Sequence, residues 1–95
     1  MVIPVEWLDK KINVAEAEAS HPGISDDRVV RFPEAAKPFG FQHDEWKELK
    51  AELRLGDELW TFTSPPEFWK QRRGRAGIAL VRDGKIVSTL ITEFN

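Results

Sequence analysis

Two β-rich runs near the end of the chain, AGIALVR and KIVSTLITEF, are separated by the dipeptide Asp83-Gly84. Asp-Gly between such runs is a strong hairpin signal, because both positions of a tight type I′ turn take positive φ. A two-residue turn then sets the register of the two strands. It pairs Arg82 with Lys85, Val81 with Ile86, Leu80 with Val87, and Ile78 with Thr89.

Both faces of this predicted hairpin are apolar. Val81, Ile86 and Leu90 share one face, and Ile78, Leu80, Val87 and Ile91 share the other. A sheet with two apolar faces has to be covered on both sides or to dimerise, so the chain is expected to be a monomer or a homodimer. The run DELWTFT supplies a third strand. We therefore predict an α+β fold, a single domain over residues 1–95, with a three-stranded antiparallel meander packed by two helices.

Apolar residues at helical spacing predict those two helices. The first runs from about Val5 to Ala19, with an alternative start at Asn13, because NVAE resembles an N-cap followed by an acid at the third helical position. The second starts at His43 or Asp44 and ends before Gly56, and it places Trp46, Leu49 and Leu53 on one face. Residues 24–42, interrupted by prolines and a glycine, are predicted to be irregular, with one short strand or turn, and to lie over the core.

Composition bounds the class of protein. The chain has 95 residues, 41% of them hydrophobic and 32% charged, which is typical of one globular domain. It contains no cysteine, which excludes disulfides, thiolate metal sites and cysteine nucleophiles and fits a cytoplasmic protein. No apolar run approaches the roughly 18 residues of a membrane span, and the first residues lack the order of a secretion signal. We expect no membrane association.

Four titratable residues are the candidates for catalysis or metal binding: His21, His43, Asp26 and Asp27. HDEW at His43 lacks the second histidine of a zinc-binding HExxH helix, and a histidine with acids at a helix start is the ordinary explanation. His21 lies in the turn SHPG. Adjacent carboxylates generally point apart, and no calcium-loop spacing follows them. We predict no catalytic residue, metal or cofactor; an enzyme using His43 with Asp26 or Asp27 is the weaker alternative.

The segment EFWKQRRGRAG is the strongest candidate for binding. It places an aromatic pair beside four cations: Phe68, Trp69, Lys70, Arg72, Arg73 and Arg75. It also lies in the more basic part of the chain, since residues 60–95 carry six bases and three acids, whereas residues 1–59 carry eight and thirteen. Tryptophan and arginine are enriched at protein interfaces, and the same residues can neutralise phosphates and stack on unpaired bases. A solvated connector with its aromatic pair closing the core is the structural alternative.

A second charged surface is predicted on the helix near residue 45. Three acids, Glu45, Glu48 and Glu52, line one flank of its apolar stripe, while lysines and an arginine line the other side. Such a flank can bind a basic partner or imitate the charge of nucleic acid, as inhibitor and immunity proteins do. The leading hypothesis is nevertheless a non-enzymatic module that binds another protein through Phe68 to Arg75. Single-stranded nucleic-acid binding through that segment is the first alternative.

Residues Leu53 to Val87 carry a recognisable pattern, GDELW followed by SPP, W and GRAGIALVRDGKIV. This tract resembles the C-terminal part of short uncharacterised bacterial proteins. The resemblance implies a bacterial source and brings no activity, cofactor or site residue with it.

Overall fold

A computed structural model describes residues 3–23 and 37–95. Over these residues the chain is a small α+β fold with three α-helices and an open antiparallel sheet. It divides into two units, which we call the sheet unit (residues 1–12 and 53–95) and the helical unit (residues 13–52). The predicted α+β class is confirmed.

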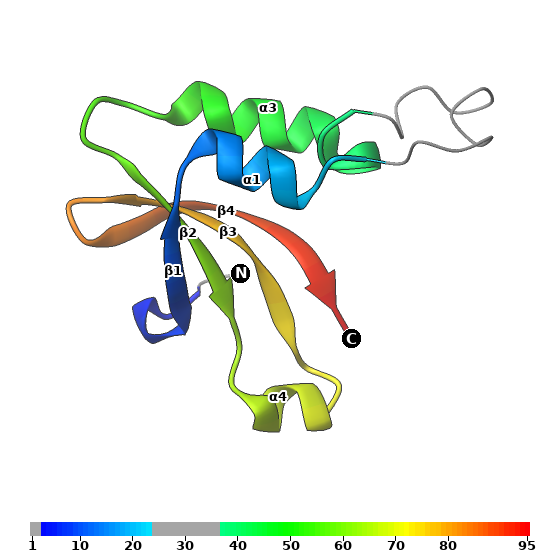
Figure 1. The fold of residues 1–95 in the computed structure, drawn as a ribbon. Helices are drawn as coiled ribbons and strands as arrows, with labels where there is room; N and C mark the ends of the chain where they lie inside the picture. Colours follow the sequence, from blue (N-terminus) through cyan, green and yellow to red (C-terminus); the bar gives the residue numbers. More distant parts are fainter. Residues whose placement is uncertain (1–2, 24–36) are drawn as a thin grey trace, which may run out of the picture. The chain divides into compact units, whose positions relative to one another are not determined.

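The sheet has four strands in the order β1-β2-β3-β4, with every neighbouring pair antiparallel (Figure 1). Their bounds are Leu8–Ile12 for β1, Glu58–Thr63 for β2, Arg75–Arg82 for β3 and Lys85–Phe94 for β4. The last three are the predicted meander. The prediction of only three strands was wrong, because β1 adds to the outer side of β2.

The segment that forms β1 was predicted to be the first half of a helix. Instead, a 3-10 turn, η1 (Val5–Trp7), leads into β1, and the helix α1 (Val14–Ser20) starts only at the alternative site. Asn13 caps this helix. Its Oδ1 accepts from the Glu16 amide at 2.7 Å, and its own amide donates to the Glu16 carboxylate at 3.2 Å, which is a complete capping box.

The hairpin turn is where the sequence places it, with φ of 53° at Asp83 and 75° at Gly84. Its first two pairs, Arg82 with Lys85 and Val81 with Ile86, are confirmed. The next two are wrong, because a bulge inserts Val87 and shifts the register by one residue. Leu80 pairs with Ser88, and Ile78 pairs with Leu90.

The bulge also corrects the predicted faces of the sheet. Leu90, predicted on the face of Val81, lies instead with Ile78 and Leu80, and all three are buried. Val87, predicted beside Ile78 and Leu80, is 45% exposed. The opposite face carries a core cluster within the sheet unit. This cluster consists of Ile3, Phe62, Ala79 and Val81, with Trp7, Leu8, Trp60, Ile86 and Ile91 packed against it. One-residue slippage exchanges the faces of a strand, so the bulge decides which residues enter this core.

The predicted second helix is confirmed as α3 (His43–Glu52), preceded by the 3-10 turn η3 (Gly40–Gln42). Trp46 and Leu49 are buried as expected. In the helical unit, the rings of His21 and Phe39 stack at 4.4 Å, and Phe39 lies 4.5 Å from Trp46. Residues 24–36, most of the stretch predicted to be irregular, lie outside the described residues. No helix in the described part of the chain is long and apolar enough to cross a membrane.

Candidate functional site

The segment from Phe68 to Arg75, which we call the basic segment, occupies most of the connection between β2 and β3 and ends at the first residue of β3. The connection begins with Ser64 and two prolines and contains a short helix, α4 (Pro66–Lys70) (Figure 1). Pro66 stands at the first helical position, where its missing N–H costs no hydrogen bond. The connection therefore starts from a fixed backbone geometry.

Ser64 closes the base of this connection. Its amide donates to the Arg75 carbonyl at 2.9 Å, and its hydroxyl accepts from the Arg75 amide at 2.9 Å. Ser64 is buried, at 3% exposure, so these bonds are shielded from water. The two ends of the connection are thus joined directly.

Trp69 holds the connection from within. Its Nε1 donates to the Ser64 carbonyl at 3.1 Å, and its indole ring lies against Gly74. A Cβ on Gly74 would come within 2.1 to 2.7 Å of three carbons of that ring, so only glycine permits this approach. The Trp69 side chain is half-buried and has a structural role in the connection.

Phe68 also faces its own unit. Its ring meets Trp7 edge to face, with the centroids 5.2 Å apart and the planes at 69°. Both residues are half-buried. The aromatic pair of the basic segment therefore packs within the sheet unit, as the structural alternative predicted; that alternative also predicted solvent-exposed cations.

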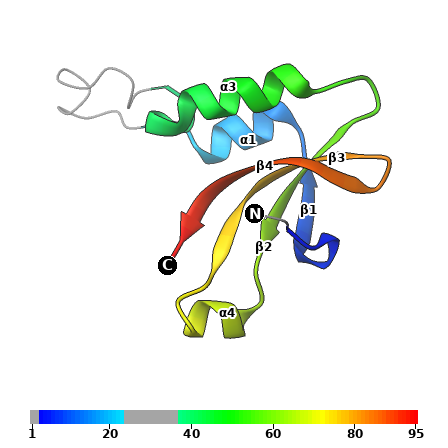
Figure 2. The same cartoon turned by 180° about the vertical axis from the view of Figure 1, so that it is seen from behind.

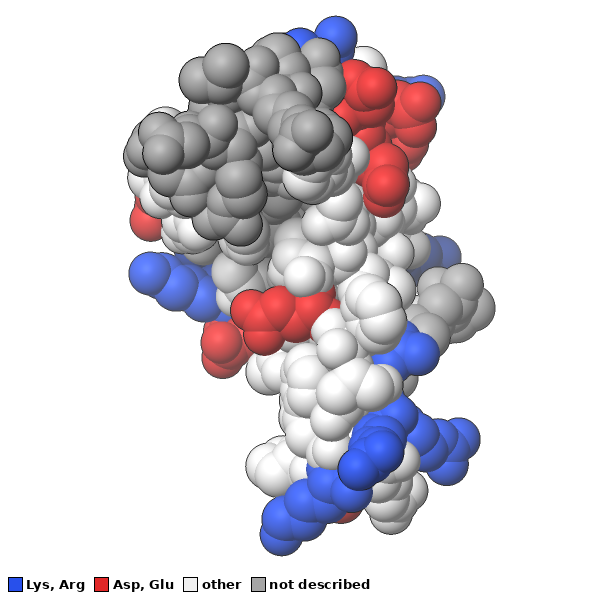
Figure 3. All heavy atoms as spheres, turned by 90° about the vertical axis from the view of Figure 1, so that its right-hand side faces the viewer, with Lys and Arg blue, Asp and Glu red and all other residues white. Residues whose placement is uncertain are grey.

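Three of the four cations, Lys70, Arg72 and Arg73, are exposed. Within residues 3–23 and 37–95 their side chains make no ion pair or hydrogen bond. Their backbone is nevertheless ordered by the helix end, because the amide of Arg72 donates to the Trp69 carbonyl and that of Arg73 to the Phe68 carbonyl. Arg72 adopts a left-handed φ of 57°. Figure 3 shows lysine and arginine side chains gathered at the end of the sheet unit that carries α4.

Arg75 differs from the other three cations. It is half-buried, its Nη1 donates to the Gly74 carbonyl at 2.7 Å, and its guanidinium lies over the ring of Phe94 at 5.5 Å from the centroid. Arg75 and Phe94 are partners in the β3–β4 register. Arg75 is thus fixed against the end of β4.

Asn95 ties the end of β4 to the basic segment. Its Oδ1 accepts from the Gly74 amide at 2.8 Å, and its Nδ2 donates to the Trp69 carbonyl at 2.8 Å. Figure 2 shows the end of β4 and α4 at the same end of the sheet. Phe94 and Asn95 lie outside the segment that the sequence predicted to bind. The Arg75–Phe94 pairing could have indicated them, but two register shifts in β4 hide it from simple counting.

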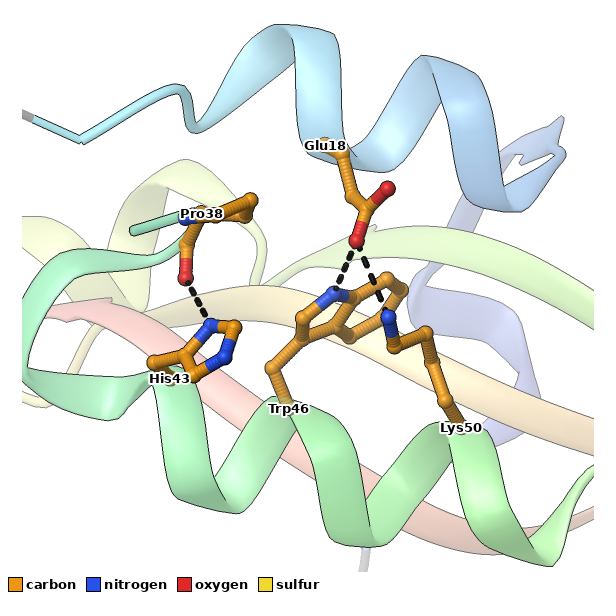
Figure 4. Close-up of polar contacts among 5 residues, drawn as sticks. All are labelled: Glu18, Pro38, His43, Trp46 and Lys50. Atoms are coloured by element: carbon orange, nitrogen blue, oxygen red, sulfur yellow. Dashed lines mark hydrogen bonds and ion pairs between the residues drawn. The ribbon is translucent and has the colours of Figure 1, made fainter. Parts of the chain in front are cut away.

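The helical unit holds the other candidates. Glu45, Glu48 and Glu52 are exposed on α3, as the acidic flank requires. Glu18 of α1 is engaged instead: one carboxylate oxygen accepts from Trp46 Nε1 and from Lys50 Nζ, each at 3.0 Å (Figure 4). Both bonds lower the pKa of Glu18, and the bond from Trp46 has the larger effect.

The histidines are held by backbone carbonyls. His43 Nδ1 lies 2.9 Å from the Pro38 carbonyl (Figure 4), and His21 Nδ1 lies 3.2 Å from the Ala17 carbonyl. Asp26 and Asp27 lie outside the described residues. The predicted pairing of His43 with one of them therefore stays a prediction. Among the residues that the structure describes, no three His, Asp or Glu side chains gather where they could hold a metal ion.

No protein-family model matches this chain, and comparisons with curated proteins and with solved structures find no match.

Proposed function

We propose that this protein is a non-enzymatic interaction module that binds an acidic surface of another protein through the basic segment. The observation that carries the proposal is the state of Lys70, Arg72 and Arg73. They are exposed and have no ionic partner in the described part of the chain. The backbone beneath them is held by Ser64, Trp69 and Asn95.

A fixed backbone favours binding, because less conformational freedom is lost when the partner docks. The connection is held at both ends by Ser64 and Arg75, so the cations start from a defined position. Arginine suits this role, since its planar guanidinium offers two parallel donors to a carboxylate. Lys70, Arg72, Arg73 and Arg75 outnumber the acids nearby, Glu67 and Glu93, and this excess of positive charge also steers an acidic partner toward the segment.

Single-stranded nucleic acid is the competing ligand for the same cations. Base stacking needs an aromatic face that is free, and it supplies roughly 1–3 kcal/mol per base. Trp69 lies against Gly74, and Phe68 meets Trp7. These contacts engage both aromatic rings of the basic segment itself, on which the nucleic-acid alternative relied for stacking.

Fluorescence anisotropy tests the proposal with two labelled probes, an oligo-glutamate peptide and a mixed-sequence single-stranded DNA, each at about 50 and 200 mM salt. We expect the wild type to bind the peptide, and the double variant Arg72→Ala, Arg73→Ala to bind it at least about tenfold more weakly. The variant Lys10→Ala, Lys85→Ala removes the same charge from exposed positions elsewhere in the sheet unit and is expected to keep most of the affinity.

Two results contradict the proposal. If the two double variants lose affinity equally, net charge and not the basic segment governs binding. If DNA binds much more tightly than the peptide and loses affinity steeply with salt, the nucleic-acid alternative replaces the protein one.

A further inference from the structure

An exposed aromatic ring lies next to the basic segment. Phe94, near the end of β4, is 73% exposed and pairs with Arg75 in the β3–β4 register. The Arg75 guanidinium lies over its ring, 5.5 Å from the centroid. Arginine and aromatic residues, phenylalanine included, are both enriched at the cores of protein interfaces.

The surrounding bonds fix the backbone on both sides of this ring. The next residue, Asn95, bonds to both Gly74 and Trp69, and Glu93 pairs with Ala76 on the neighbouring strand. Arg75 is itself held by the Gly74 carbonyl. Because Phe94 lies between two anchored neighbours, little conformational freedom is left to lose when a partner covers the ring.

The other exposed apolar residues of the sheet unit lack this combination. Leu55, the most exposed, lies in the turn before β2, and Val5 and Val87 are about half exposed. None of the three is adjacent in sequence or strand pairing to the basic segment. Phe68 and Trp69 belong to the segment but pack within their unit. Phe94 is therefore the apolar residue best placed to be buried together with the cations.

We infer that Phe94, backed by Arg75, is the apolar anchor of the binding surface, and that the partner segment carries an apolar side chain beside its carboxylates. The inference rests on the proposed function and specifies its ligand. The carboxylates meet Lys70, Arg72 and Arg73, while the apolar side chain covers the Phe94 ring. Burying a leucine-sized side chain is worth a gain of roughly tenfold in affinity.

The test is a double-mutant cycle, in which one protein residue and one ligand residue are changed separately and together and the affinity is measured each time. The ligands are the oligo-glutamate peptide and the same peptide with a single leucine inserted, and the proteins are the wild type, Phe94→Ala, Phe94→Leu and Leu55→Ala. We expect the wild type to bind the leucine peptide roughly tenfold more tightly than the plain one. The gain disappears in Phe94→Ala, persists in part in Phe94→Leu, and is unchanged in Leu55→Ala.

The outcomes separate the two proposals. If the wild type binds oligo-glutamate and Phe94→Ala keeps the leucine gain, the anchor is wrong while the proposed function stands. If Phe94→Ala weakens both peptides equally, Phe94 acts on the fold and the anchor is again overturned. If the wild type binds neither peptide, the proposed function fails and the anchor fails with it. Should Phe94→Ala not fold, Phe94→Leu decides the matter: a leucine gain smaller than that of the wild type supports the anchor, and an undiminished gain overturns it.

Discussion

Asp57 and Arg82 form a bidentate ion pair that joins the turn before β2 to the end of β3. Arg82 Nε donates to one carboxylate oxygen at 2.9 Å and Nη2 to the other at 2.8 Å. The Asp57 side chain is only 3% exposed, and the Arg54 amide donates to it as well, at 2.9 Å. These donors, Arg82 above all, lower the pKa of Asp57 from 3.8 to about 2.

This pair predicts a loss of stability in acid. Above pH 3.8 Asp57 is charged in the folded and unfolded chain, and the pair contributes in full; as the pH falls toward 2, the unfolded chain takes up the proton first and the contribution is lost. Urea unfolding at a series of pH values should show a shallower pH dependence between about 4 and 2 for Asp57→Asn than for the wild type. Arg82→Lys keeps the positive charge but loses the bidentate geometry of the guanidinium, so its pH dependence is expected to lie between those of the wild type and Asp57→Asn. Equal slopes for all three proteins would contradict this role.

The contact between Trp69 and Gly74 predicts that Gly74→Ala is destabilising. The added methyl group would overlap the indole ring, and overpacking of this kind costs about 1–3 kcal/mol. Urea unfolding measures the cost, and hydrogen exchange of the amides from 64 to 75 should show faster exchange in the variant. Gln71→Ala, an exposed change in the same connection, is expected to stay within about 0.5 kcal/mol of the wild type. A Gly74→Ala protein as stable as Gln71→Ala would show that the ring moves aside freely.

The capping box predicts that Asn13 sets the start of α1. Asn13→Ala removes the acceptor of the Glu16 amide and is expected to cost about 1 kcal/mol, with a loss of helix signal in far-UV circular dichroism. Asn13→Asp keeps the acceptor and should keep most of the stability. If alanine and aspartate behave alike, the cap contributes nothing measurable.

The bond from Trp46 to Glu18 predicts an asymmetry between two substitutions. Trp46 is fully buried, so Glu18→Ala leaves its indole N–H without this acceptor at a cost of about 1–3 kcal/mol. Glu18→Gln can still accept that bond and loses only the carboxylate charge that pairs with Lys50; because both side chains are 32% exposed, its effect should be smaller. Thermal unfolding of both variants measures the difference; equal losses would assign the effect to the ion pair alone.

Local signals predicted several elements correctly. The turn at Asp83 and Gly84 follows from the φ angles that its two residues tolerate, and the strands beside it follow from their composition. The helix α3 follows from its apolar spacing, and the cap of α1 was available as the alternative at Asn13. Each of these depends on residues that are close in sequence.

The errors have a common cause. The spacing of Val5, Leu8 and Ile12 suits a helix face, but pairing with β2 turns Leu8–Ile12 into a strand. The bulge at Val87 likewise depends on how β4 packs along β3. Nothing within either segment encodes the partner strand, and strand preference is set largely by that context.

The basic segment shows the same division. Its composition alone predicted a binding surface made of Phe68, Trp69 and four cations, of which Lys70, Arg72 and Arg73 are exposed, because clustered charge can be read directly from the residue types. Only the tertiary structure separated these exposed cations from Arg75, turned Trp69 inward onto Gly74 and brought Phe94 and Asn95 to the segment. The sequence determined the chemistry of the residues and the local turns, since both are properties of neighbours along the chain. Tertiary structure decided which side chains stay open to a partner, because burial depends on contacts between residues far apart in sequence.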